Sequence, residues 1–419
     1  MRILFCADTF PGRFGALAAA FAADGHEVLF ASHYGRRDFS IPGVQRVLFK
    51  PVRSPRIDKA LPGEAARAEW SKTLLASHYA SEVFAAMRKR GFIPDMVVFS
   101  GSSGAALSVS RAFPESVLLG FADALPARAS REAEEVAQLR LRACLAQSHA
   151  CFAFSEQHLR GIPPLLQREA CLLPLAVDTD FFSPEASSPF ELEGQNIGER
   201  KLVTVDLYST ASATSRELWH LCAGMLAHRP EVLLLMNCAD QDLGDIARNS
   251  AKALPAFWQS RIFVQDFRSL HLWRDMLCAS TLHLCPEAVA GAAPIPEVLE
   301  AMSCGTLLAL PENAARVLGH FLARAPLPGA VRADAPAAEG DGEPYCLPLP
   351  ATSTEERLAA LCSAIDDAPL RDHLKKNSRT IIIRRYSEEL SVPDQKQCLL
   401  EAWERWNQLG NEPNPMYKG

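Results

Sequence analysis

The stretch Pro294-Ile-Pro-Glu-Val-Leu-Glu-Ala-Met-Ser-Cys-Gly-Thr-Leu-Leu-Ala-Leu310 predicts a short helix followed directly by a strand. Two prolines open it, where their fixed φ suits a first helical turn, and Gly305 ends the helix. The apolar run after this glycine predicts a buried strand. Glu300 has two interpretations: it complements the helix dipole, or it is directed at ligand hydroxyls beside N–H groups that favour phosphate. The stretch by itself favours the first.

The composition is that of an ordinary soluble globular protein, with 48% hydrophobic and 22% charged residues over 419 residues. This length predicts two or three domains. A net charge of −6 argues against a nucleic-acid-binding surface. The twelve cysteines have no metal-ligand spacing and indicate free thiols in a reducing compartment. The N-terminus is a strand pattern and not a signal peptide, and no apolar run reaches membrane-spanning length, so we expect a cytoplasmic protein.

The first part of the chain alternates strand and helix patterns, which predicts a parallel α/β sheet. The expected strands are 2–7, 26–32, 96–100, 117–121, 150–154 and 172–177, and the expected helices are 16–23, 65–90, 105–111 and 131–148. The loop after the first strand contains Gly12 and lies where open parallel sheets bind ligands. It is not a dinucleotide fingerprint, so a ligand role and a simple tight turn both stay open. The Gly/Ser loop 101–104 is a second candidate nest for an anion or a sugar.

The alternation restarts after residues 183–199, whose proline, glycine and acidic composition predicts an interdomain linker. The expected strands are 201–207, 232–236, 261–264, 282–285 and 306–310, and the expected helices are 215–228, 270–279, 354–367, 370–386 and 393–409. Residues 333–342 indicate a mobile insertion, and the tail after Gly410 is expected to fray. We predict an N-terminal domain over 1–182, a second domain over 200–385 and a closing segment over 386–419. Two such halves indicate an enzyme that closes on ligands between its lobes.

Several motifs resemble those of retaining glycosyltransferases of the family-4 type. Leu173-Pro-Leu-Ala-Val-Asp-Thr-Asp-Phe-Phe-Ser-Pro184 resembles their hinge motif, with Ala176 in place of a glycine, and Val298-Leu-Glu-Ala-Met-Ser-Cys-Gly-Thr306 resembles their donor-site motif. Further similarities lie at residues 10–15 with 25–28, 91–95, 113–120, and 378–386 with 392–395. The resemblance covers nearly the whole chain, and the motifs are specific together because they occur in the expected order.

The resemblance implies a GT-B architecture: two facing Rossmann-like domains, with the acceptor bound in the N-terminal one and a nucleotide-sugar in the C-terminal one. It also implies a last helix that crosses back to the N-terminal domain. In that picture Glu300 accepts hydrogen bonds from the donor ribose, and the Gly12 loop faces the diphosphate. No metal and no cofactor are expected, since positive side chains and helix dipoles offset the charge of the leaving diphosphate.

The donor region departs from the family pattern. Ala292 stands where a first glutamate is common, with Glu297 and Glu287 as nearby carboxylates. The loop from Asp206 to Glu217 lacks the usual Arg and Lys that bind the diphosphate, and Asp206 stands about where that Arg is expected and should repel phosphate. Arg216 and Arg268 are the candidate substitutes, or else ordinary surface arginines.

The acceptor region departs from the pattern too. Ser100-Gly-Ser-Ser-Gly-Ala105 replaces a motif with a histidine and an aromatic residue, which leaves Ser102 and Ser103 as acceptor-side candidates. Asp123-Ala-Leu-Pro126 replaces an aromatic motif, and Asp123 is its acidic stand-in. His26 is interpreted as structural, and neither His271 nor His283 nor His320 has a spacing that indicates a catalytic dyad. No catalytic residue is assigned.

Three hypotheses follow. The first is a hexosyltransferase-type glycosyltransferase that moves a sugar, with retention, from a nucleotide-sugar to a glycan, lipid-linked or protein acceptor. The second is a catalytically degenerate GT-B protein that acts as a binding or scaffold partner in glycan assembly. The third is another sugar-phosphate or nucleotide-binding α/β enzyme of the same fold. No nucleic acid and no transmembrane segment are expected, and a peripheral membrane contact stays open.

Overall fold

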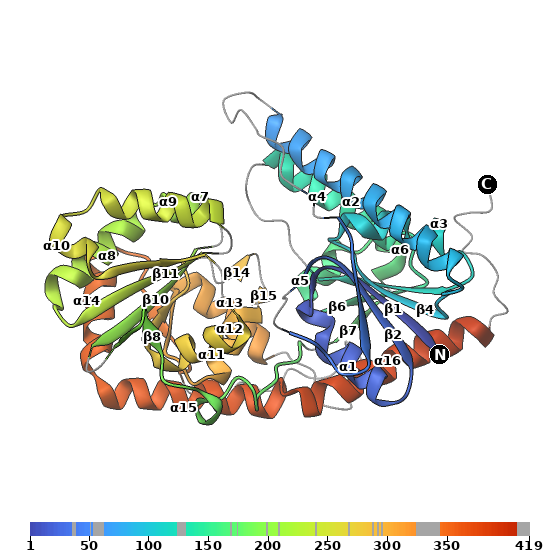
Figure 1. Ribbon diagram of the computed structural model, residues 1–419. Coiled ribbons are helices and arrows are strands. Elements are labelled where there is room, and N and C mark those ends of the chain that lie inside the picture. The colour runs from blue at the N-terminus through green and yellow to red at the C-terminus, as the bar shows by residue number, and fades with distance from the viewer. Residues whose placement is uncertain are drawn as a thin grey trace. The chain divides into compact units, whose positions relative to one another are not determined.

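The computed structural model describes residues 1–35, 39–50, 52, 63–123, 131–167, 170–173, 175–197, 200–207, 210–238, 241–266, 269–286, 289–290, 293–294, 296–323 and 344–408. These residues form two compact units (Figure 1). The first contains residues 1–176 and those from 388 on, and the second contains 177–323 and 344–387. The expected insertion at 333–342, the expected frayed tail and Arg268 all lie outside the described residues.

The first unit is built on a parallel sheet with the strand order β3-β2-β1-β4-β5-β6-β7. Its strands are β1 (Arg2–Phe10), β2 (Glu27–Gly35), β3 (Val44–Leu48), β4 (Met96–Ser100), β5 (Val117–Ala122), β6 (Ala150–Ala153) and β7 (Cys171–Leu172). Ile3 pairs with Val28 on one side of β1 and with Met96 on the other. The central strands are buried on both faces, which is why they are nearly continuous apolar runs.

Helices cover this sheet, and aromatic rings fill the space between the layers. The helices are η1 (Gly12–Phe14), α1 (Gly15–Ala23), α2 (Glu64–Lys89), η2 (Gly104–Ser108), α3 (Val109–Ala112), α4 (Arg131–Leu145), α5 (Glu156–Gly161) and α6 (Pro164–Gln167). Phe5 on β1 stacks on Phe30 with ring centroids 5.9 Å apart, and Phe14 meets Phe121 edge-on at 5.0 Å. Phe21 on α1 also contacts Phe5, with ring centroids 6.2 Å apart. Such aromatic pairs add to the energy of simple apolar burial, and the Phe5–Phe21 pair holds α1 on the sheet.

The second unit repeats the plan with the strand order β12-β11-β10-β13-β16-β17, again parallel. These strands are β10 (Lys201–Leu207), β11 (Val232–Cys238), β12 (Ile262–Gln265), β13 (Ser280–Leu284), β16 (Leu308–Pro311) and β17 (Leu347–Leu349). The helices are α7 (Thr210–Ala213), α8 (Arg216–His228), α9 (Gln241–Lys252), α10 (Ala256–Gln259), α11 (Leu270–Ala279), α12 (Pro296–Ser303), α13 (Glu312–Ala323), α14 (Thr354–Asp366) and α15 (Ala368–Arg385). β14 (Val289–Ala290) and β15 (Ala293–Pro294) pair as a small antiparallel ladder. Together the two sheets confirm the predicted pair of Rossmann-like α/β domains.

The chain leaves α12 through a Schellman motif. Gly305 has φ of +64°, and its N–H donates to the carbonyl of Met302 at 3.0 Å. The N–H of Thr306 donates to the carbonyl of Ala301, also at 3.0 Å. These two bonds satisfy carbonyls at the end of α12 and turn the chain sharply into β16. The Cys-Gly-Thr sequence therefore has a local structural role.

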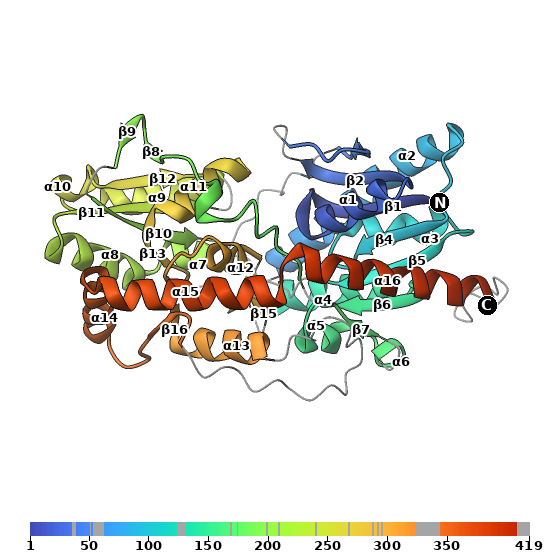
Figure 2. The same ribbon diagram turned by 90° about the horizontal axis from the view of Figure 1, so that it is seen from below.

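The last two long helices belong to different units. α15 packs on α12 in the second unit, whereas α16 (Glu388–Gln408) packs on α1 and β5 in the first (Figure 2). Lys396 on α16 donates to Asp24 at 2.6 Å, and the Trp406 ring stacks on His149 at 3.8 Å. The predicted final helix that crosses back to the N-terminal domain is confirmed.

Several predicted elements differ from the structure. Of the expected strand 172–177, the described residues place only Leu172 in a strand, β7, and Pro174 lies outside the described residues. The expected linker 183–199 contains η3 (Pro184–Ala186) and a small hairpin of β8 (Glu191–Leu192) and β9 (Gln195–Asn196), joined by Glu193 and Gly194 at positive φ. α16 begins before Pro393, not at it. β3, α9, α13 and β17 were not predicted. β3 and β17 are short and have mixed burial patterns. α9 and α13 have clear amphipathic patterns, which sequence reasoning missed.

Candidate functional site

In each sheet the strand order reverses at one point, where the chain stops adding strands on one side and begins to add them on the other. Ligands of such sheets bind at this switch point, beyond the carboxyl ends of the strands. In the first unit this point lies between β1 and β4, and in the second it lies between β10 and β13. Polar residues at these strand ends therefore mark two candidate sites. In the first unit they include Asp8 and the serines after β4. In the second they include Asp206, Cys285 and the neighbouring helix α12.

Glu300 is held by a buried tryptophan. The indole Nε1 of Trp273 on α11 donates to Glu300 Oε2 at 2.6 Å, and Trp273 is only 1% exposed. Glu300 lies one turn into α12, whereas Glu297 is the acid of its first turn. Because the dipole effect is confined to the first turn, the capping interpretation applies to Glu297 and not to Glu300. The half-buried Glu300 carboxylate is instead fixed by a specific donor.

A buried polar cluster lies against Trp273. The Trp273 ring meets the ring of His283 on β13 edge-on, with centroids 5.7 Å apart. His283 Nε2 lies 3.0 Å from Asp206 Oδ2, and its Nδ1 lies 2.6 Å from Thr204 Oγ1. Asp206, His283 and Thr204 are all fully buried. The spacing around His283 in the sequence gave no indication of these partners, since they come from the neighbouring strand β10 and not from nearby sequence.

The carboxylate of Asp206 lies inside the second unit. It accepts a hydrogen bond from Nδ2 of Asn237 on β11 in addition to its contact with His283. The prediction that Asp206 faces a bound phosphate and repels it was therefore wrong, because its side chain is fully buried. Cys285 follows β13 and lies beside the same carboxylate, with Sγ 4.0 Å from Oδ2. Burial first, and then Asp206 and Glu297, raise the pKa of this thiol well above its ordinary value.

The other donor-side candidates are dispersed. Arg216 is exposed and is the first residue of α8, directly after the cap in which Ser215 Oγ accepts from the N–H of Leu218 at 3.3 Å. Glu297 is half-buried on α12. Arg268, like Glu287 and Ala292, lies outside the described residues. The donor roles of Glu300, Glu297, Arg216 and Arg268 stay predictions.

Two serines hold two carboxylates in the first unit, and a third serine contacts one of these serines. Ser103 Oγ donates to Asp8 Oδ1 at 2.6 Å, and Ser102 Oγ donates to Asp123 Oδ1 at 3.2 Å. Ser100 Oγ lies 2.8 Å from Ser102 Oγ and extends the Ser102–Asp123 contact. The structure therefore brings together the acceptor-side candidates Ser102, Ser103 and Asp123, and adds Asp8 to them. Paired carboxylates and hydroxyls of this kind suit the hydroxyl groups of a sugar.

Asp8 has a perturbed acidity. The residue is exposed overall, yet protein packed around its carboxylate desolvates it, and this is the largest cause of its raised pKa. The hydrogen bond from Ser103 and the nearby His33 and Arg140 act in the opposite direction, whereas Asp123 adds to the increase. A carboxylate with a raised pKa in a cluster at strand ends is a functional-site candidate.

His33 lies on β2 next to this cluster and is 4% exposed. Its Nδ1 donates to the carbonyl of Lys50 at 3.0 Å, and its Nε2 is buried without a hydrogen-bond partner in the described part of the chain. The ring also packs on Phe49, with centroids 4.9 Å apart. His33 is therefore oriented by its neighbours, and one ring nitrogen remains available for a polar group brought by a ligand.

Gly12 opens η1 with φ of +50° and is exposed. A Cβ at this position would meet no atom within 4 Å, so glycine is required by the backbone conformation and not by crowding. The tight-turn interpretation thus has a structural basis. The predicted contact of Gly12 with a diphosphate stays a prediction.

Sequence reasoning missed Asp8, His33 and Trp273. Asp8 follows the apolar run 2–7 near the carboxyl end of β1, and this signal was available because Gly12 was found by the same argument. The roles of His33 and Trp273 depend on contacts between elements far apart in sequence. A lone histidine in a strand and a lone tryptophan in a helix carry no local signal that separates them from core residues.

Residues 24–125 match the family model described as "Glycosyl transferase family 4 group". This range includes His33, Ser102, Ser103 and Asp123 of the first unit. No curated protein matches the chain.

Solved structures share the fold over nearly the full length. HepE of Anabaena, crystallised with UDP and glucose, is 15% identical with a TM-score of 0.60, and the match covers 97% of this chain and 100% of that one. Sucrose-phosphate synthase from Thermosynechococcus elongatus is 13% identical with a TM-score of 0.64, with 97% and 100% covered. WaaG, a glycosyltransferase involved in lipopolysaccharide biosynthesis, is 15% identical with a TM-score of 0.58, with 95% and 99% covered. At these identities the similarity establishes the fold, which is GT-B. The chain therefore resembles the family-4 type of GT-B glycosyltransferases, through the family match in its first unit and through a fold shared over nearly its whole length.

Proposed function

We propose that the protein is a glycosyltransferase that moves a hexosyl group, with retention, from a nucleotide-sugar to a glycan, lipid-linked or protein acceptor. The observation that carries the proposal is Glu300, fixed by Trp273 in the helix that follows β13 of the second unit. A carboxylate accepts hydrogen bonds from two neighbouring hydroxyls, which is the pattern that a ribose offers. The crystal structures of HepE with UDP support a nucleoside diphosphate as the ligand of this fold.

The proposal assigns the diphosphate to the start of α8. Arg216 is exposed there, and the N-terminus of a helix after the first strand of a Rossmann-like unit favours a phosphate group. Since the carboxylate of Asp206 is buried and hydrogen-bonded, its charge does not face this place. Cationic side chains and the helix dipole then stabilise the leaving diphosphate without a catalytic metal. Arg268 and Gly12 remain proposed phosphate contacts.

The acceptor is assigned to the serine–carboxylate cluster of the first unit. Asp8 and Asp123 are hydrogen-bond acceptors for hydroxyl groups, and Ser102 and Ser103 orient them. The raised pKa of Asp8 gives its carboxylate a higher affinity for a proton, which suits a group that takes a hydrogen bond from an attacking hydroxyl. His33 Nε2 is a further polar contact at this site.

Calorimetry with UDP, GDP and their sugars tests the donor site. Wild type is compared with Glu300→Ala and with Glu300→Gln, and Glu312→Ala serves as the control because Glu312 is an exposed acid elsewhere in the same unit. We expect micromolar binding of one nucleotide, strong loss in Glu300→Ala, partial loss in Glu300→Gln and no change in Glu312→Ala. An unchanged affinity in Glu300→Ala contradicts the assigned role of Glu300.

Absence of binding by every nucleotide at millimolar concentration contradicts the enzyme proposal. The second candidate, a degenerate GT-B protein that binds partners in glycan assembly, then takes its place. Binding of a nucleotide without transfer of its sugar to any acceptor leads to the same conclusion. Binding of a free sugar phosphate in preference to a nucleotide-sugar leads instead to another enzyme of the same fold.

The proposed location is the cytoplasm, where nucleotide-sugars and reduced cysteines coexist. Among the described residues every cysteine is free, and most are buried. None of the described helices is both long and apolar enough to span a membrane. A peripheral contact with a membrane would accompany a lipid-linked acceptor.

A further inference from the structure

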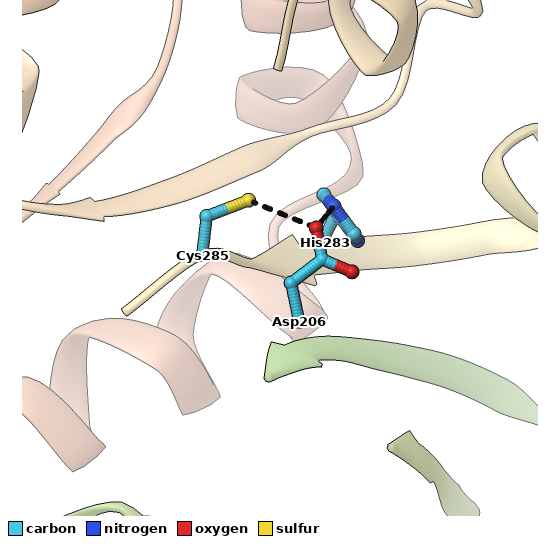
Figure 3. A group of neighbouring side chains, drawn as sticks. All are labelled: Asp206, His283 and Cys285. Atoms are coloured by element: carbon cyan, nitrogen blue, oxygen red, sulfur yellow. Dashed lines mark hydrogen bonds and ion pairs between the residues drawn. The ribbon is translucent and has the colours of Figure 1, made fainter. Parts of the chain in front are cut away.

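The buried cluster of the second unit brings three different ligand types together. Asp206 lies on β10 on the same face as Thr204, which pairs with His283 across β10 and β13. Cys285 follows His283 by two residues and so points to the same face. Ligand atoms of Asp206, His283 and Cys285 all lie within 4.8 Å of one another, and each residue is 0% exposed. Figure 3 shows the imidazole nitrogen and the thiol sulfur converging on one oxygen of the carboxylate.

The hydrogens around His283 can be assigned from its neighbours. Ser280 Oγ donates its hydrogen to the carbonyl of Met276 at 2.7 Å, and Thr204 Oγ1 lies 3.1 Å from Ser280 Oγ. Since the one hydroxyl hydrogen of Ser280 is used in the bond to Met276, Thr204 is the donor in its contact with Ser280. Thr204 Oγ1 then accepts from Nδ1–H of His283, at 2.6 Å. In the neutral ring this places the proton on Nδ1 and leaves the lone pair on Nε2.

That lone pair faces a carboxylate oxygen 3.0 Å away, so two acceptors would oppose each other unless a positive charge lies between them. A second ring proton is one source of that charge, and a metal ion is the other. The position of Cys285 favours the ion. Its Sγ lies 4.0 Å from Asp206 Oδ2, which is long even for a hydrogen bond from a thiol, so the thiol contributes little to the hydrogen bonding of the carboxylate. Asn237 is 1% exposed and donates to Asp206 through Nδ2, yet its Oδ1 is buried without a partner among the described residues.

We propose that Asp206, His283 and Cys285 bind one divalent transition-metal ion of the zinc class. A carboxylate oxygen, an imidazole nitrogen and a thiolate are ligand types that Zn²⁺ takes in proteins. The two negative ligands balance the two charges of the ion, so the filled site is neutral in a fully buried place. The bond from Nδ1 to Thr204 is the kind of outer contact that orients a ligating histidine.

The ion has a structural role in this proposal. It joins the carboxyl ends of β10 and β13 beneath Trp273, and Trp273 in turn fixes Glu300. The sequence analysis expected no metal and free thiols at the cysteines, and the proposed site departs from that expectation. The site is separate from the chemistry at the diphosphate. Binding deprotonates Cys285, and the released proton goes to the buffer. The inference goes beyond the proposed function and does not depend on it.

The test uses the full chain, unfolded with a chelator and refolded with Co²⁺ or Zn²⁺, because a fully buried site fills most readily during folding. We expect one ion per chain, a thiolate-to-cobalt charge-transfer band with Co²⁺, and a rise of the unfolding temperature with Zn²⁺. Cys285→Ser should abolish the band and the rise in unfolding temperature. Cys222→Ser, which changes another fully buried cysteine of the same unit on α8, should keep both.

A second variant keeps the test decisive if Cys285→Ser does not fold. Thr204→Val removes the partner of His283 Nδ1 but leaves all three ligands, and should weaken the affinity for Zn²⁺ roughly 10- to 100-fold in competition with a chelating dye. No ion bound by the refolded wild type overturns the proposal and makes the cluster an imidazolium–carboxylate pair. Equal binding by wild type, Cys285→Ser and Thr204→Val also overturns it, because the ion is then held elsewhere.

Discussion

The indole N–H of Trp273 is the group that sets the position of Glu300. Trp273 is almost fully buried, and it packs on His283 on one side while it donates to the carboxylate at 2.6 Å. A buried donor paired with a charged acceptor forms a strong hydrogen bond, and its loss leaves both groups less well satisfied. The rotamer of Glu300 is thus fixed by the interior of the second unit before any ligand binds.

We therefore expect Trp273→Phe to weaken nucleotide binding about tenfold, because a hydrogen bond to a charged group contributes roughly 1.5–3 kcal/mol. Phenylalanine keeps most of the ring packing on His283, so the protein should still fold. Calorimetry with the nucleotide that wild type binds measures the change. Trp258→Phe, a partly buried tryptophan elsewhere in the same unit, is the matched control. Equal affinities in wild type and Trp273→Phe would show that the indole does not position Glu300.

The carboxyl group of Asp8 makes the stability of the first unit depend on pH. Its pKa is raised from the ordinary value of 3.8, first by desolvation, so the folded protein binds this proton more tightly than the unfolded chain does. Over the pH range from 3.8 up to the raised value, stability consequently falls as pH rises. The ionised carboxylate is the form that the fold tolerates less well.

Asp8→Asn removes this titration and keeps an oxygen for Ser103. We expect the free energy of unfolding of wild type, relative to Asp8→Asn, to decrease as pH rises through that range and then to level off. Urea unfolding at a series of pH values measures it, with Glu115→Gln, an exposed acid of the same unit, as the control. A difference that stays constant with pH would contradict the assigned acidity.

At the scale of elements, the end of α12 determines where β16 begins. Gly305 adopts φ of +64°, and a Cβ there would lie 3.8 Å from its nearest neighbour, Pro184 Cγ, which is ordinary contact. The need for glycine is therefore conformational. The motif that resembles the donor-site sequence of the family thus combines the proposed ligand contact of Glu300 with a glycine at which the helix ends.

Gly305→Ala should destabilise the second unit by about 1–2 kcal/mol, because alanine avoids the left-handed region. Gly305→Asn should cost less, since asparagine enters that region more readily. Denaturant unfolding followed by the fluorescence of the second unit measures both. If alanine and asparagine have equal effects, the cost comes from the surroundings and not from φ.

At the scale of the molecule, the chain's last long helix stabilises the first unit. α16 packs on α1 and β5, and Trp406 stacks on His149 with an interplanar angle of 17°. His149 Nδ1 accepts from the N–H of Leu118 at 2.9 Å, so this nitrogen carries no proton in the fold. Burial lowers the pKa of His149 to about 4. The first unit is thus completed by residues from the far end of the sequence.

Trp406→Ala should expose His149 and raise its pKa toward its ordinary value of 6.5. The neutral histidine of wild type contributes stability that is present above pH 6.5 and is lost as pH falls toward 4, and this loss should be smaller in the variant. NMR titration of the His149 ring measures the pKa, and a parallel series of unfolding curves measures the stability. A pKa that stays near 4 in Trp406→Ala would show that α16 does not bury the ring.

The sequence by itself determined the parts that depend on local pattern. Alternating apolar runs and amphipathic stretches predicted two parallel α/β domains, and these are confirmed together with the returning final helix. The Gly305 stop and the position of Glu300 in a short helix could also be predicted, because helix signals lie within a few residues of one another. Elements with weak periodicity, such as β3 and β17, could not.

The tertiary structure decided which side chains meet. Ser103 and Asp8 are 95 residues apart in sequence, and Asp206 and His283 are 77 apart, yet the polar atoms of the two pairs lie 2.6 Å and 3.0 Å apart. Strand order and register create these contacts, and a shift of one residue would turn each side chain to the opposite face of its sheet. The sequence therefore placed an acid at position 206 and a histidine at position 283. Only the fold shows that the two side chains meet in one buried cluster, which contacts Glu300 through Trp273.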